Sequence, residues 1–215
     1  MIINDKICNR CRETKLTNEF YKNKTTKDRF QSNCKTCFKE ISRERYAASI
    51  VFLDEMRVGE EGYNDTAIRY ATTNPEQWAD TMLYLLENID ENPETGCYIW
   101  KKSKNIYGYG CFQVYLPTTP ASSFQVKAHR LSFALSWGMD ALPFGERENS
   151  GDTLDHICGV RDCVNALHLQ VIPHTLNASL QKQERVVPKG YGRIIDATFA
   201  SPSLIAAIEN AGVDK

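Results

Sequence analysis

Residues 154–182 read LDHICGVRDCVNALHLQVIPHTLNASLQK, which is the most informative segment of the chain. LDHI is a short apolar run typical of a strand, and HLQVIP is a second run that ends at Pro173. Two cysteines occupy the loop between these runs. HTLNASLQKQ then has the composition of a helix. The predicted order is therefore strand, loop, strand and helix.

Two kinds of metal ligand are interleaved in this stretch. Cys158, Cys163 and His168 offer thiolates and an imidazole, which suit tetrahedral zinc. A closed structural site needs one more ligand. The two cysteines outside the obvious clusters, Cys97 and Cys111, are the candidates for that fourth position.

The second kind of ligand is a hard oxygen atom. Asp155 and Asn177 offer a carboxylate and an amide, which suit Mg²⁺ or a similar ion. His156 stands beside Asp155 and can act as a general base near neutral pH. The structural alternatives are that Asp155 caps a turn and that Asn177 is an N-cap or a polar surface residue. His174 lies near these residues in the sequence and is expected to face solvent.

The elements upstream suit the same kind of domain. Asn74 followed by Pro75 is a helix start, and apolar residues then recur at helical spacing through residue 89. CYIW and GCFQVYL are short strand-like runs around the Tyr-Gly-Tyr-Gly stretch at 107–110. An extended run, FQVKAHR, precedes an apolar helix, RLSFALSWGM. A short basic segment follows the first of these runs and is either a solvated turn or functional: Lys101, Lys102 and Lys104.

These residues and their spacing resemble the HNH (His-Me finger) superfamily, within it the zinc-containing branch that includes the His-Cys box homing endonucleases. The three namesake positions correspond to His156, Asn165 and Asn177, with Asn in place of the final His. GCYIWKKSKNIYGYGCF is similar to the strand pair before the motif in many phage HNH proteins. AHRLSFAL is similar to the strand-to-helix element that lies between this strand pair and the motif. The resemblance covers about residues 90–180.

The resemblance implies an α+β protein with a ββα-metal nuclease domain, and a metal-dependent DNA endonuclease that hydrolyses phosphodiester bonds. His156 would be the general base, and Asp155 and Asn177 would hold a single Mg²⁺ or Mn²⁺ ion. Asn165 would tie the loop to the backbone and steer His156. Arg130 would clamp the phosphate, with His129 as a weaker candidate. The resemblance also favours Cys97 over Cys111 as the fourth zinc ligand.

A second cysteine cluster lies near the N-terminus. Cys8, Cys11, Cys34 and Cys37 form two C-x2-C pairs separated by 22 residues, which is the spacing of a four-cysteine zinc site. The polar segment between the pairs cannot form a core alone, so a metal would stabilise the fold. Zinc modules of this kind bind DNA, bind protein or only staple a short chain. A DNA contact is favoured by these basic residues: Lys22, Lys24, Lys27, Arg29, Lys35 and Lys39.

The formal net charge of −1 conceals segregation along the chain. Residues 1–46 carry 12 Lys/Arg against 6 Asp/Glu, residues 47–95 carry 2 against 11, and residues 96–195 carry 11 against 7. Both basic blocks contain a cysteine cluster, which favours a polyanionic partner over charges that merely cluster on solvated faces. The resemblance implies that this partner is double-stranded DNA. No apolar run is long enough for a membrane helix, and the N-terminus has no signal-peptide core. The expected location is the cytoplasm.

The resulting organisation has four parts: a zinc module at 1–46, an acidic helical linker at 47–95, an HNH nuclease domain at 96–185 and an extension at 186–215. SPSLIAAIENAG in the extension is expected to form a last helix. The expected setting is a phage or mobile element, with restriction as an alternative. A catalytically silent zinc-dependent DNA-binding regulator is the rival function, and a protein-interaction adaptor is a third. Monomer and homodimer both stay open, because no coiled-coil seam is present.

Overall fold

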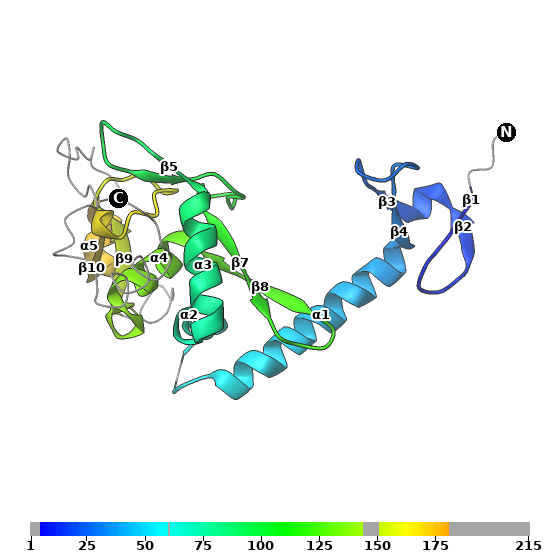
Figure 1. The fold of residues 1–215 in the computed structure, drawn as a ribbon, viewed down its shortest axis with the longest axis horizontal. Helices are drawn as coiled ribbons and strands as arrows, with labels where there is room; N and C mark the ends of the chain where they lie inside the picture. The colour runs from blue at the N-terminus through cyan, green and yellow to red at the C-terminus, as the bar shows by residue number, and fades with distance from the viewer. Residues whose placement is uncertain (1–4, 60, 144–150, 181–215) are drawn as a thin grey trace. The chain divides into compact units, whose positions relative to one another are not determined.

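The computed structural model describes residues 5–59, 61–143 and 151–180 (Figure 1). The chain forms two compact units. The first is Met1–Phe52 with Leu116–Ser123, and the second is Leu53–Tyr115 with Phe124–Lys215. Within the described residues the fold is mixed, with five α-helices and small two-stranded sheets.

The first unit is built from two short hairpins and the start of a long helix. β1 (Asp5–Ile7) pairs antiparallel with β2 (Thr14–Leu16). After the short 3-10 helix η1 (Thr17–Glu19), β3 (Phe20–Lys22) pairs antiparallel with β4 (Phe30–Cys34). α1 (Lys35–Met56) begins directly after β4 and is the long helix that runs from blue to cyan in Figure 1.

The core of the first unit is very small. Its fully buried cluster consists of Phe20 and three cysteines, with Cys11 and Phe30 packed against it. Burial of so few apolar side chains stabilises a fold by only a few kcal/mol, at about 25 cal/mol per Å² of apolar surface removed from water. The cluster therefore suits a unit whose folding depends on a ligand bound by the cysteines.

Three helices form much of the core of the second unit. They are α2 (Tyr63–Thr73), α3 (Pro75–Glu87) and α4 (Ala128–Trp137). The side chain of Asn74 caps α3 by accepting a hydrogen bond from the Gln77 N–H, as its sequence predicts. α2 packs against α3 and α4, and every residue of α4 from Ala128 to Leu135 is buried.

This packing corrects the predicted boundary at residue 95. Residues 47–95 were expected to be an acidic linker, whereas α2 and α3 belong to the compact second unit. Ala67, Ile68 and Ala71 of α2 are completely buried, which a solvated spacer would not show. The acidic composition of this segment had indicated exposure to solvent, but Glu61 and Asp65 are buried and ion-paired.

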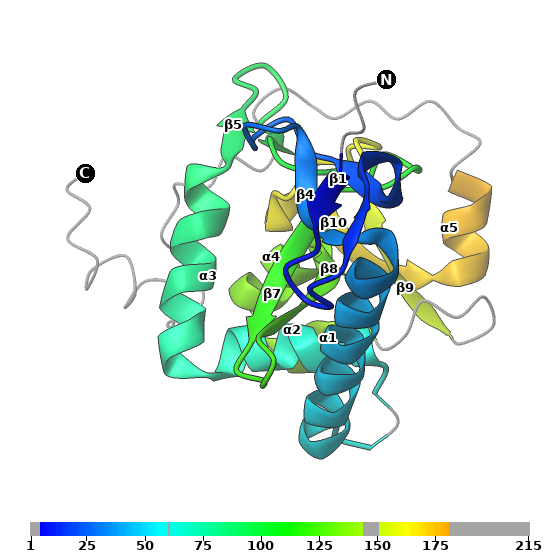
Figure 2. The same cartoon turned by 90° about the vertical axis from the view of Figure 1, so that its right-hand side faces the viewer.

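Small antiparallel sheets complete the second unit. β5 (Ile89–Glu91) pairs with β6 (Tyr98–Trp100), and β9 (Asp152–His156) pairs with β10 (Leu169–Pro173). β7 (Cys111–Leu116) and β8 (Ser122–Lys127) form another two-stranded sheet. The short 3-10 helices are η2 (Met139–Ala141) and η3 (Ala166–His168). α5 (His174–Leu180) follows β10 directly and packs against β9 and β10, as Figure 2 shows.

The strand, loop, strand and helix predicted for residues 154–182 is thus present as β9, β10 and α5. The predicted extension at 186–215, with its last helix, lies outside the described residues. None of the helices among those residues is both long enough and apolar enough to span a membrane.

Candidate functional site

The first feature of the second unit is a buried group of three thiols and one imidazole. Cys97, Cys158, Cys163 and His168 place their ligand atoms within 4.8 Å of one another. The Nδ1 atom of His168 lies 3.4 Å from the Cys97 sulfur and 3.6 Å from the Cys163 sulfur. A tetrahedral metal ion binds four such atoms, and this ligand set is consistent with zinc.

The fourth member of this group is Cys97, as predicted from the family resemblance. It stands just before β6, whereas the other three members lie between β9 and β10. The loops are held together by the Trp100 N–H, which donates to the Asp162 carbonyl, and by the Val164 N–H, which donates to the Tyr98 carbonyl. Cys111 stands apart, and its sulfur contacts the Tyr109 carbonyl at 3.7 Å.

Ionisation of these thiols is coupled. A hydrogen bond from Cys163 lowers the pKa of Cys158 to about 4, in spite of the burial that opposes its charge. The same hydrogen bond and burial raise the pKa of Cys163. The group therefore carries a thiolate at neutral pH, which is the form that binds a metal ion.

A second group lies in the first unit. Cys8, Cys11, Cys34 and Cys37 also bring their sulfur atoms within 4.8 Å of one another. Burial opposes the charge of Cys8, but backbone hydrogen bonds, among them one from the Cys34 N–H at 3.3 Å, lower its pKa to about 6. Burial and the hydrogen bonds that Cys37 donates to the other thiols raise the pKa of Cys37 to about 12. The predicted four-cysteine site thus has the geometry that a metal ion requires.

His156 occupies the last position of β9, directly across from Leu169 of β10. The side chain is only 5% exposed, and its Nε2 atom lies 3.0 Å from the Cys163 carbonyl oxygen. Since a carbonyl oxygen can only accept, this contact places the N–H of the ring at Nε2. In the neutral imidazole the lone pair is then at Nδ1, where it can accept a proton.

His129 lies beside His156, with ring centroids 4.7 Å apart. Burial and the neighbouring His156 lower the pKa of His129 well below its usual value, so this ring is neutral at pH 7. Its Nδ1 atom is buried and has no hydrogen-bond partner among the residues that the structure describes. The sequence had suggested His129 as a weak phosphate clamp, whereas the structure makes it a neutral ring packed on His156.

Asp155 and Asn177 were predicted to hold a hard cation. Asp155 is buried on β9, and its Oδ2 atom accepts a hydrogen bond of 2.9 Å from the Gln170 side chain. Asn177 stands on α5, the helix that packs against β9 and β10. Its Oδ1 atom is buried and has no partner within residues 5–59, 61–143 and 151–180. An amide oxygen is a type of ligand that a hard cation can bind.

Asn165 is completely buried and links two loops. Its Oδ1 atom accepts from the Leu167 N–H at 3.0 Å and so caps η3. Its Nδ2 atom donates to the Gly96 carbonyl at 2.8 Å. Asn165 therefore joins the segment before β6 to the loop between β9 and β10, and Cys97 and His168 lie on either side of this link.

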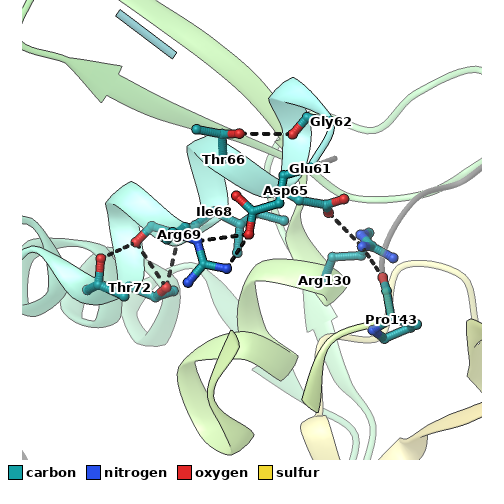
Figure 3. Close-up of polar contacts among 10 residues, drawn as sticks. Glu61, Gly62, Asp65, Thr66, Ile68, Arg69, Thr72, Arg130 and Pro143 are labelled. Atoms are coloured by element: carbon teal, nitrogen blue, oxygen red, sulfur yellow. Dashed lines mark hydrogen bonds and ion pairs between the residues drawn. The ribbon is translucent and has the colours of Figure 1, made fainter. Parts of the chain in front are cut away.

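Arg130 does not have the position predicted for a phosphate clamp. Its side chain is 3% exposed, and its guanidinium donates to the Asp65 carboxylate at 2.7 Å and to the Pro143 carbonyl at 2.8 Å (Figure 3). Within this buried network the guanidinium joins α4 to α2. The predicted phosphate contact is therefore replaced by a structural ion pair, because Asp65 reaches Arg130 from a helix that the sequence analysis did not foresee.

The basic residues predicted to contact DNA in the first unit are exposed on its surface: Lys22, Lys24, Lys27, Arg29 and Lys35. Arg29 has a left-handed backbone, with a φ of 64°, and its guanidinium donates to the Lys24 carbonyl at 2.7 Å. The Nζ atom of Lys35 lies 5.7 Å from the centre of the Tyr21 ring. These contacts order two cations and leave the others in water.

Sequence reasoning missed the ring of Tyr109. It contacts the His129 and His156 rings at centroid distances of 5.3 and 5.9 Å. Lys127 and Arg161 lie over the same tyrosine, at 5.1 and 5.8 Å from its centroid. The Tyr-Gly-Tyr-Gly stretch at 107–110 was the available signal, since aromatic residues between basic ones are typical of nucleic-acid contacts.

No protein family model, curated protein or solved structure matches this chain. Its function is therefore inferred from the residues of the site. These residues combine a buried thiolate group suited to a structural metal, a strand-end imidazole with a defined tautomer, and an amide oxygen with no partner in the described part of the chain.

Proposed function

We propose that the second unit is a metal-dependent DNA endonuclease of the HNH type, in which a ββα-metal motif is formed by β9, β10 and α5. The observation that carries the proposal is the position of His156. It ends β9 with its Nε2 atom 3.0 Å from the Cys163 carbonyl, next to a helix that bears Asn177. General bases are commonly oriented in this way, by a hydrogen bond to the ring nitrogen that does not take the proton.

In the proposed reaction, His156 removes a proton from the water molecule that attacks the scissile phosphorus. The hydrogen bond to Cys163 fixes the ring orientation and keeps a proton at Nε2. The neutral ring of His129 packs against His156 without adding a positive charge nearby, which would lower the basicity of His156. The products would carry a 5′-phosphate and a 3′-hydroxyl.

Asp155 and Asn177 are the residues proposed to hold Mg²⁺ or Mn²⁺. Their oxygen atoms are the ligands that hard cations prefer, and the Oδ1 atom of Asn177 is buried without a partner among the described residues. Such an ion, when bound, would stabilise the negative charge that develops on the phosphate oxygens. Gln170 orients Asp155 through the hydrogen bond to its Oδ2 atom.

The two cysteine-rich groups are proposed to hold structural zinc. In the second unit, the group joins the segment before β6 to the loop that contains the Cys163 carbonyl, so it supports the partner of His156. In the first unit, the group would stabilise two hairpins that have almost no apolar core, and the exposed lysines around it would contact DNA phosphates.

The alternative is a catalytically silent DNA-binding regulator on the same fold. One observation favours it: the Asp155 and His156 side chains are only 4% and 5% exposed, so this conformation gives water little access to them. An endonuclease would have to expose the His156 ring when DNA binds, whereas a regulator would have no need to do so.

Plasmid cleavage with Mg²⁺ tests the proposal. We expect the zinc-loaded protein to relax or linearise the plasmid, and His156→Ala to lower the rate by about 100-fold or more, which is the usual contribution of a general base. His174→Ala is the matched control, because His174 lies on α5 outside both metal-binding groups. Zinc content measured by mass spectrometry should be equal in all three proteins.

Two results would remove the proposal. Equal cleavage by the parent and by His156→Ala would show that the activity does not depend on this histidine. DNA binding with strong salt dependence, and no cleavage of random-sequence DNA by any protein, would instead favour the silent regulator.

A further inference from the structure

The loop at residues 102–110 is rigidly built. The Asn105 Oδ1 atom accepts hydrogen bonds from the Tyr107 and Tyr109 N–H groups, both at 3.0 Å. The Asn105 N–H donates to the Tyr109 carbonyl at 2.9 Å, and Lys104 forms a bridge to Gly110. A loop held by so many local hydrogen bonds loses little conformational entropy when it meets a partner.

Its tip presents two large apolar side chains to water. Ile106 is 91% exposed and Tyr107 is 63% exposed. Single exposed apolar residues are common on protein surfaces and need no explanation. Here, however, two adjacent ones are fixed at the tip of an ordered turn, so the loop is prepared to place them against a partner.

Two cations flank this tip and indicate the charge of the partner. The Arg161 guanidinium donates to the Tyr107 carbonyl at 3.0 Å, which uses one of its five N–H donors. Lys127 and Arg161 both lie over the Tyr109 ring. Asp162, which follows Arg161 in the sequence, is already paired with Lys104 of the loop. The surface around the tip therefore has a positive charge that suits a polyanion.

Tyr109 connects this surface to the proposed reaction centre. Its ring contacts His156 at a centroid distance of 5.9 Å, and it belongs to the same short loop as Ile106. A duplex whose backbone reached Lys127 and Arg161 would thus bring a phosphate close to His156, and the loop tip would meet the adjacent groove.

We propose that residues 102–110, together with Lys127 and Arg161, form a DNA-contact element. Lys127 and Arg161 contact backbone phosphates, and Ile106 and Tyr107 enter the minor groove and partly unstack a base step, as apolar side chains do in other minor-groove contacts. The proposal rests on the proposed function in taking duplex DNA as the substrate. It is tested by binding alone, so it does not depend on cleavage.

The test uses full-length, zinc-loaded protein carrying His156→Ala, with a short fluorescent duplex followed by anisotropy over a range of salt concentrations. Ile106→Ala and Tyr107→Ala should each weaken binding about fivefold or more, without changing the salt dependence. Arg161→Gln and Lys127→Gln should each reduce the slope of log affinity against log salt by about 0.9. A 2-aminopurine base in the duplex should brighten on binding the parent and stay dim with Ile106→Ala.

Matched controls come from the same unit. Tyr115→Ala removes a tyrosine that is 70% exposed, and Arg57→Gln removes a cation that also lies over a tyrosine ring, 6.0 Å from the centroid of Tyr63. Neither is part of the loop or contacts Tyr109 in the structure's described contacts. Both controls should bind like the parent.

The outcomes separate this proposal from the proposed function. If the parent binds duplex DNA and the variants at Ile106, Tyr107, Lys127 and Arg161 all bind equally well, the proposed contact element is wrong. The endonuclease proposal would still stand. Equal affinity for an RNA duplex of the same sequence would also overturn groove entry, because the minor groove of A-form RNA is wide and shallow. If the parent does not bind duplex DNA at all, both proposals fall together.

Discussion

The imidazole rings of His129 and His156 lie 4.7 Å apart between centroids, one on the first turn of α4 and the other at the end of β9. Two charged rings at this distance would repel each other, and burial excludes the water that could screen them. The pair therefore tolerates at most one positive charge. Burial, and then the neighbouring His156, lower the pKa of His129 and keep its ring neutral at pH 7.

This pair predicts how stability depends on pH. The pKa of His129 is lower in the folded chain than in the unfolded chain, so the unfolded state binds more protons below about pH 6.5. The stabilisation is complete above the unfolded pKa and is lost as the pH falls towards the folded pKa. His129→Gln should therefore lose less stability than the parent between about pH 7.5 and pH 5.5, as measured by urea unfolding of the zinc-loaded protein.

His174→Gln is the control, since His174 stands on α5 and is not part of the His129 and His156 pair. It should follow the parent at every pH. Equal acid sensitivity of the parent and His129→Gln would show that other groups, such as the metal-binding thiols, account for the whole pH dependence.

The buried pair of Asp65 and Arg130 predicts a large loss of stability when one partner is removed. Asp65→Ala leaves the buried Arg130 guanidinium without its carboxylate partner, which should cost about 3–5 kcal/mol. The double variant Asp65→Leu with Arg130→Met leaves no buried charge and should lose less than Asp65→Ala alone. Urea unfolding measures all three proteins, and a double variant that is less stable than the single one would contradict this view of the pair.

Gly110 predicts a steric effect. A Cβ atom at this position would lie 2.8 Å from Cδ1 of Trp100 and 3.2 Å from Cβ of Ala128, and Trp100 is itself buried. Gly110→Ala should therefore lower the free energy of unfolding by about 1–3 kcal/mol. Gly62→Ala is the control, because nothing lies within 4 Å of its Cβ position and its φ of −80° is allowed for alanine. Thermal unfolding distinguishes the two, and equal midpoints would contradict the prediction.

Zinc stoichiometry distinguishes the two isolated cysteines. Cys97→Ser removes a member of the buried metal-binding group, so the zinc content should fall from about two ions to about one per chain, with a lower melting temperature. Cys111→Ser removes a sulfur that lies outside both metal-binding groups and contacts the Tyr109 carbonyl, so the protein should keep both ions. Loss of zinc from Cys111→Ser but not from Cys97→Ser would reverse the assignment.

Local sequence patterns predicted the parts of the fold that depend on local interactions. The start of α3 followed from Asn74 and Pro75, and β9, β10 and α5 followed from short apolar runs and Pro173. The metal-binding cysteines followed from their spacing, since the two C-x2-C pairs each supply neighbouring ligands. The choice of Cys97 needed the family resemblance, because no spacing rule relates it to His168.

Non-local contacts account for what the sequence could not predict. α2 begins at Tyr63, and Gly62 before it has no side chain to cap the helix, so no strong local signal marks this start. The buried face of α2 packs against α3 and α4. The carboxylate partner of Arg130 lies 65 positions away in the sequence. The residues around Arg130 therefore cannot show whether it is an exposed phosphate clamp or part of a buried ion pair. Tyr109, Lys127 and Arg161 likewise come together only in the folded unit.

The separation of Cys97 from His168 has a consequence for how the protein is made. The two residues are 71 positions apart, and at about 5–20 residues per second a ribosome needs about 4–14 seconds to add the chain between them. Until that interval ends, β9 lacks its partner strand β10, and the metal-binding group lacks its last ligand, His168. A nascent or truncated chain that stops before His168 therefore cannot assemble the proposed reaction centre.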